Sequence, residues 1–83
     1  MNLKEFDDML RQFDWYYSMS DDNRVWRAGE AANDRIREVA KTSAEHKELY
    51  ELWSKYHFSG EPWGTEKFTR EMLDAERQRL RVL

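Results

Sequence analysis

The feature that most constrains the fold of this chain is a run of apolar residues near its start, spaced alternately by three and four positions. The run consists of Leu3, Phe6, Leu10, Phe13 and Tyr17. An α-helix completes one turn in about 3.6 residues, so this spacing places all of these side chains on one face of the helix. It therefore predicts an amphipathic helix over residues 3–17 that begins at Asn2 as its N-cap. A short coiled-coil seam is the alternative, but the run is brief for one.

A second helix is predicted over residues 20–41. The Ser20 hydroxyl is suited to accept from backbone N–H groups of a first helical turn, and Asp21 and Asp22 favour the positive end of the helix dipole. The apolar positions that follow keep helical spacing: Val25, Ala28 or Gly29, Ala32, Ile36 and Val39. Because several of these residues are small, we expect another helix or a large aromatic side chain to approach this face closely.

A third helix is predicted to run to about residue 58, with its N-terminus marked by a capping box. Thr42 and Glu45 have the spacing in which side chain and backbone satisfy each other at a helix start. The apolar positions of this segment are Leu49, Leu52 or Trp53, and Tyr56. Their spacing predicts one face directed to the core.

The remaining segment predicts a loop over residues 59–65 and a fourth helix that Thr65 caps. Gly and Pro cluster in the loop, and Pro62 disfavours helix at the residue before it. The fourth helix has a weaker stripe, made of Phe68, Met72, Ala75 or Glu76, Leu80 and Leu83. We therefore expect a single all-α domain over residues 1–83. It would be a small bundle of three to four helices, whose C-terminal helix projects or is swapped between protomers.

The small size of the chain limits how large its core can be. A domain of 83 residues buries only about 60% of the surface that its unfolded chain exposes. Twelve aromatic residues, four each of Trp, Tyr and Phe, compensate for this. Each buried aromatic removes roughly 150–250 Å² from water. A homodimer would be a further way to gain stability.

Charge and cysteine content exclude several classes of protein. The chain has 14 Lys and Arg against 17 Asp and Glu, a net charge of −3, which is far from that of a strongly basic nucleic-acid binder. Without cysteine it forms neither a disulfide framework nor a thiolate metal site, which is typical of a reducing compartment. No window approaches the 18 or so apolar residues of a membrane span, and the start lacks the apolar run of a signal peptide. We therefore expect a cytoplasmic protein that does not enter a membrane.

The motifs of common catalytic and metal-binding sites do not occur. The sequence has neither a serine elbow nor a Gly-rich phosphate loop, and paired carboxylates such as Asp7 and Asp8 lie where helix starts and solvated faces explain them. His46 and His57 share a helix face but lie roughly 16 Å apart at about 1.5 Å per residue, too far for one ion. We expect no enzyme activity, no cofactor and no metal.

Large aromatics flanked by charge are the clearest indication of a binding role. The stretch Asp14–Trp26 joins an aromatic cluster to a further Trp, and another Trp lies in the Gly- and Pro-containing loop. Trp, Tyr and Arg are the residues of which binding hot spots consist. We infer that the surplus rings face outward and bind another protein. The alternative is that a chain this short uses its large aromatics as core, with Trp63 folded back over the bundle as a lid. The candidate contacts are Trp15, Tyr16, Trp26 and Trp63, with Arg24 and Arg27 as charged neighbours.

Nucleic-acid binding or regulation is the alternative function. The second helix carries several Arg and Lys residues, but acidic residues interleave with them and favour a salt-bridged solvated face. The last seven residues contain no acidic residue and three arginines: Arg77, Arg79 and Arg81. These three arginines are the candidate phosphate contacts.

The stretch Asp14–Glu30, which reads DWYYSMSDDNRVWRAGE, resembles short uncharacterised proteins encoded by tailed bacteriophages. The resemblance covers about a fifth of the chain and implies no activity and no functional residues. The resemblance implies a small acidic protein that is made during infection. Such a protein would bind a host or phage protein and redirect its action.

Overall fold

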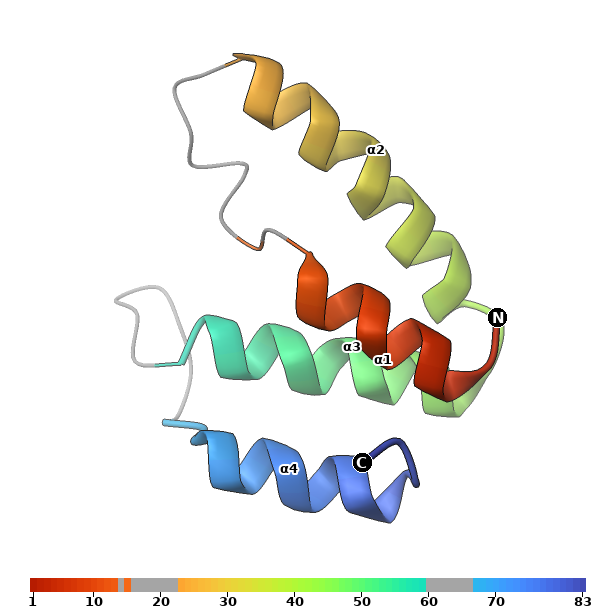
Figure 1. Ribbon diagram of the computed structural model, residues 1–83, viewed down its shortest axis with the longest axis vertical. Helices are drawn as coiled ribbons and strands as arrows, with labels where there is room; N and C mark the ends of the chain where they lie inside the picture. The colour runs from red at the N-terminus through yellow and green to blue at the C-terminus, as the bar shows by residue number, and fades with distance from the viewer. Residues whose placement is uncertain (14, 16–22, 60–66) are drawn as a thin grey trace.

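The chain folds into four α-helices in the part that the structure, a computed structural model, describes (Figure 1). That part comprises residues 1–13, 15, 23–59 and 67–83, with the backbone alone for 23–28. The helices are α1 (Leu3–Gln12), α2 (Asn23–Ala40), α3 (Ala44–His57) and α4 (Arg70–Arg79). No strand occurs within these ranges. The prediction of a small all-α bundle is confirmed.

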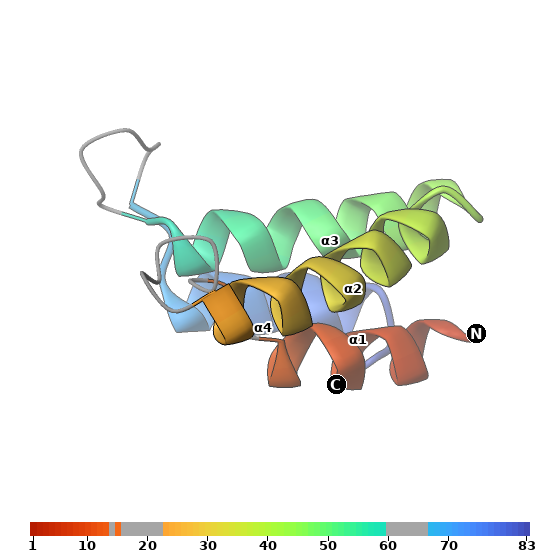
Figure 2. The same cartoon turned by 90° about the horizontal axis from the view of Figure 1, so that it is seen from above.

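Helix α3 is the central element, because it contacts each of the other three helices. Figure 1 shows α2 on one side of α1 and α3, with α4 on the other side, and Figure 2 shows α1 and α3 on opposite sides of the bundle. The apolar side chains between them form one core: Phe6, Leu10, Trp15, Ile36, Ala40, Leu49, Trp53, Phe68, Leu73, Leu80 and Val82. The predicted stripes of the first and third helices supply much of this core.

Helix α1 begins where the sequence predicts and ends earlier. The Asn2 side chain accepts from the Glu5 backbone N–H at 2.8 Å, and the Glu5 carboxylate accepts from the Asn2 N–H at 3.2 Å, a complete capping box. The prediction that the helix continues to residue 17 is wrong, because Phe13 has an extended backbone. Beyond it the Trp15 indole N–H donates to the carbonyl of Leu10 at 3.0 Å. The indole thus satisfies one of the carbonyls that a helix end leaves open.

The turn between α2 and α3 differs from the prediction by one residue. Ser43, not Thr42, caps α3, since its hydroxyl accepts from the His46 backbone N–H at 3.1 Å. Thr42 instead donates its hydroxyl hydrogen to the carbonyl of Val39 at 2.6 Å and so closes the end of α2. Either residue is chemically able to cap, and the preceding helix end decides which one does. The predicted start of α2 at residues 20–22 lies outside the described residues.

Helix α4 packs on α3 and does not project, which corrects the expectation from its weak stripe. Thr69 caps it by accepting from the Met72 N–H at 3.2 Å, while the predicted cap, Thr65, lies outside the described residues. The buried face is also rotated by one position. Leu73 and Arg77 are buried, whereas Met72 is 47% exposed. No helix in the described part is both long enough and apolar enough to cross a membrane.

The chain leaves α4 through a Schellman motif. The N–H of Val82 donates to the carbonyl of Arg77, and that of Arg81 to the carbonyl of Gln78, both at 3.0 Å. Arg81 adopts a positive φ of 65°, in the left-handed region that usually belongs to glycine. This turn directs Val82 back into the core.

Replacing Arg81 by glycine should stabilise the fold. The left-handed backbone carries a steric cost for any residue with a Cβ, so we expect Arg81→Gly to raise the free energy of unfolding by up to about 1 kcal/mol. Urea unfolding followed by circular dichroism measures this. Arg35→Gly, in the middle of α2, is the matched control and should lower it by about 1 kcal/mol. A destabilised Arg81→Gly variant would contradict this account of the turn.

Candidate functional site

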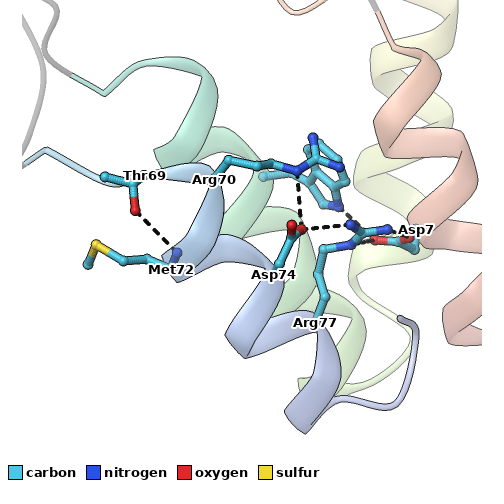
Figure 3. A network of polar contacts seen from close by, with 7 residues as sticks. Asp7, Thr69, Arg70, Met72, Asp74 and Arg77 are labelled. Atoms are coloured by element: carbon cyan, nitrogen blue, oxygen red, sulfur yellow. Dashed lines mark hydrogen bonds and ion pairs between the residues drawn. The ribbon is translucent and has the colours of Figure 1, made fainter.

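A buried carboxylate, Asp7, connects three of the four helices (Figure 3). Its Oδ1 accepts from the Trp53 indole N–H at 2.8 Å and from Arg77 Nε at 3.0 Å. Its Oδ2 accepts from Arg77 Nη2 at 2.7 Å. Asp7 is 1% exposed and Arg77 5%, so the pair is removed from water. A bidentate Arg–carboxylate geometry of this kind is the strong form of an ion pair.

A second carboxylate completes the network. Asp74 accepts from Arg77 Nη1 at 2.9 Å and from Arg70 Nε at 3.1 Å. The guanidinium groups of Arg70 and Arg77 lie over the Trp53 ring, 5.3 Å and 5.2 Å from its centroid. The hydrogen bonds from Asp7 raise the pKa of Arg77 above its ordinary value. The two arginines and the two aspartates thus neutralise one another. We infer that this network stabilises the fold.

The C-terminal arginines do not form the acid-free patch that the sequence suggested. Arg77 is buried against Asp7. Arg79 donates to Glu76 at 2.9 Å and also pairs with Glu48 of α3. Arg81 is the exposed residue of the Schellman turn. Two of these acids, Asp7 and Glu48, are distant in sequence, and Glu76 lies just before the last seven residues.

The predicted aromatic contacts fare differently where the structure describes them. Trp15 is 5% exposed and belongs to the core, so it is not an exposed contact. Its ring lies against those of Phe13, Tyr50, His57 and Phe58, at centroid distances of 5.1, 5.9, 5.1 and 6.3 Å. The predicted contacts Tyr16 and Trp63 lie outside the described residues. The other predicted contacts belong to α2, where the structure describes the backbone but not the side chains of Arg24, Trp26 and Arg27.

His57 is stacked between two indole rings, those of Trp15 at 5.1 Å and Trp53 at 5.8 Å. Burial lowers the pKa of His57 below its ordinary 6.5, and the positive charge of Arg70 lowers it further. The imidazole is therefore neutral at neutral pH. It serves as a flat aromatic spacer in the core.

Two hollows open along the seam between α2 and α3, and we name them together the α2–α3 groove. One has a volume of about 230 Å³ and is lined by Phe13, Trp15, Asn33, Arg37, Tyr50, Ser54 and Phe58. The other, of about 370 Å³, is lined by Arg37, Ala40, Lys41, Lys47, Tyr50 and Glu51. Arg37 and Tyr50 line both hollows, so they stand where the two meet.

The groove combines an apolar part with a border of polar and charged groups. Aromatic rings and one buried alanine form its apolar part, and guanidinium, ammonium, amide, hydroxyl and carboxylate groups border it. No cluster of three His, Asp or Glu side chains suited to a metal ion occurs within the described ranges. In the sequence, Arg37 is one of the interleaved charges of the second helix and Tyr50 is one of many aromatics, so helical spacing alone does not pair them across two helices.

Removing Arg77 should destabilise the protein strongly, because Asp7 would then be buried without its cation. We expect Arg77→Ala to cost about 3–5 kcal/mol in the free energy of unfolding. The double variant Asp7→Leu/Arg77→Met, which removes both charges, should recover much of that loss. Arg81→Ala, on an exposed arginine, is the control and should change little. A small effect of Arg77→Ala in urea unfolding would contradict the role given to the pair.

Acid should weaken the fold through His57. The pKa of His57 is lowered in the folded state, so the neutral imidazole contributes fully to the free energy of unfolding above pH 6.5, the ordinary pKa. This contribution is lost as the pH falls through the lowered pKa. We expect the melting temperature of wild type to fall over this range more steeply than that of His57→Phe, which keeps a flat ring. Parallel curves for the two proteins would show that His57 does not titrate in this way.

Comparison of the chain with protein-family models, curated proteins and solved structures finds no match.

Proposed function

We propose that this chain is a small non-enzymatic protein-binding module whose contact surface is the α2–α3 groove. The observation that carries this proposal is the meeting of two hollows at Arg37 and Tyr50. Tyr and Arg are enriched in binding hot spots, and such residues act best in pockets at the centre of a contact. Here one of each stands at that centre.

The Tyr50 wall of the groove is held in place before any partner binds. The Tyr50 ring lies 5.9 Å from that of Trp15, which is itself fixed by its hydrogen bond to Leu10. Helix α3, which carries Tyr50, is further held by the network around Asp7 through Trp53. A wall that is already ordered loses little conformational entropy on binding, which favours affinity.

Helix α2 forms the opposite wall and extends beyond it. The buried residues among its described side chains, Ile36 and Ala40, lie in its C-terminal half, and Figure 1 shows its N-terminal end diverging from the other helices. The predicted contacts Arg24, Trp26 and Arg27 lie on that N-terminal part. One helix thus carries both a wall of the groove and the aromatic stretch singled out in the sequence, which supports a contact surface along α2.

The biological setting is part of the proposal. The resemblance of residues 14–30 to short tailed-bacteriophage proteins favours a phage-encoded protein that acts in the host cytoplasm. Its partner would then be a host or phage protein whose activity it modulates. The alternative, nucleic-acid binding through the C-terminal arginines, has less support, because Arg77 and Arg79 are engaged by carboxylates.

Capture from a bacterial lysate tests the proposal. Arg37→Glu should lower recovery of the bound protein at least about tenfold, as expected for a central contact. Arg35→Glu, an exposed arginine of the same helix that lines neither hollow, is the matched control and should leave recovery unchanged. Nuclease treatment should have no effect.

Equal recovery with both variants would show that the groove is not the contact surface. Loss of the captured protein on nuclease treatment would assign the interaction to nucleic acid.

A further inference from the structure

We infer that the segment bound in the α2–α3 groove is acidic and carries a large apolar side chain. This inference rests on the proposed function and names the partner's chemistry at one end of the groove. We call that end the basic end, and define it by the residues that line the larger hollow: Arg37, Ala40, Lys41, Lys47, Tyr50 and Glu51.

Positive charge is concentrated at the basic end, although the chain as a whole is negative. Its lining has three cations and one carboxylate, while the net charge of the protein is −3. Arg37 lies in the last turn of α2, Lys41 follows the last residue of that helix, and Lys47 faces them from the first half of α3. The basic end therefore presents a local cationic patch from two helices, which complements an acidic ligand.

These cations are available to a ligand. Lys41 has a carboxylate neighbour, Glu38, at 3.8 Å, and both side chains are largely exposed. Exposed pairs of this kind contribute little and exchange readily. For Arg37 and Lys47, the described part of the chain contains no ion-pair partner. Carboxylates of a partner would meet Arg37 and Lys47, which no described carboxylate neutralises, and would compete with Glu38 for Lys41.

The floor of the basic end is apolar and roomy enough for a side chain. Ala40 is buried and Tyr50 half-buried, and between them the hollow has a volume of about 370 Å³. An apolar cavity of about 150 Å³ already holds a benzene ring. A Leu, Phe or Trp side chain of the partner would therefore be accommodated on this floor, with its neighbouring carboxylates reaching the surrounding cations.

The distribution of charge favours a peptide over a nucleic acid. The three cations are bordered by Glu51 and by Glu38, which would repel the continuous phosphates of a nucleic-acid backbone. A peptide spaces its carboxylates individually, so it can match the cations and avoid the two glutamates. The apolar floor between the helices also suits a side chain better than a phosphate.

Selection from a displayed library of random peptides on the intact protein tests this inference. We expect enriched peptides to combine Asp or Glu with Leu, Phe or Trp. Lys41→Glu/Lys47→Glu should weaken their binding about tenfold or more, because attraction is replaced by repulsion. Lys4→Glu/Lys67→Glu makes the same change in net charge at exposed lysines outside the groove, and should leave binding nearly unchanged. Amide chemical shifts should move at Arg37, Lys41 and Lys47 when the peptide is added.

The outcomes separate this inference from the proposed function. Enriched peptides that lack acids, bind the Lys41→Glu/Lys47→Glu variant equally and lose affinity with Arg37→Ala would overturn the acidic partner and leave the groove as a contact surface. Enriched peptides that are insensitive to all of these variants would overturn both. Duplex DNA that binds wild type and is released by Lys41→Glu/Lys47→Glu would assign the cations to nucleic acid and overturn the inference.

Discussion

The ion pair between Asp7 and Arg77 is the interaction on which the arrangement of the helices depends. A carboxylate removed from water is costly unless opposite charge and hydrogen-bond donors surround it, and Asp7 accepts three hydrogen bonds. Those donors come from α3 and α4, whereas Asp7 itself belongs to α1. The requirements of one buried group therefore fix the positions of three helices. The described side chains of α2 take no part in this network, and its C-terminal half is held by apolar packing through Ile36 and Ala40.

The aromatic residues of the described part mainly build the core. Trp15, Trp53 and the ring of His57 lie in one stack, with Tyr56 and Phe58 at its edges. The inference that surplus rings face outward is not met in this part, where each described aromatic is buried or half-buried. Four aromatic side chains lie outside the described part of the chain: Tyr16, Tyr17, Trp26 and Trp63. Among the described aromatics, Tyr50 is the one with both a core neighbour and a place in both hollows.

The sequence predicts local features of this fold well and long-range ones poorly. Apolar spacing identifies the core faces of α1 and α3, and Asn2 is recognisable as a cap because its partner Glu5 lies three residues away. The face of α4 is misjudged because periodicity treats Arg77 as a solvated charge. The residue that makes its burial favourable, Asp7, lies 70 positions earlier. The α2–α3 groove was not foreseen for the same reason, since Arg37 and Tyr50 meet only after two helices have packed.

The Asp7–Arg77 pair also bears on how the chain acquires its structure during synthesis. Translation delivers the first helix long before the fourth, so Asp7 and the Trp53 indole must wait for a guanidinium that is made later. A contact across 70 positions carries a large loop-closure cost, and the fold cannot become cooperative until that cost is met. A nascent chain that lacks α4 would hold a bare carboxylate against apolar surface. Completion of this bundle is therefore tied to the synthesis of α4.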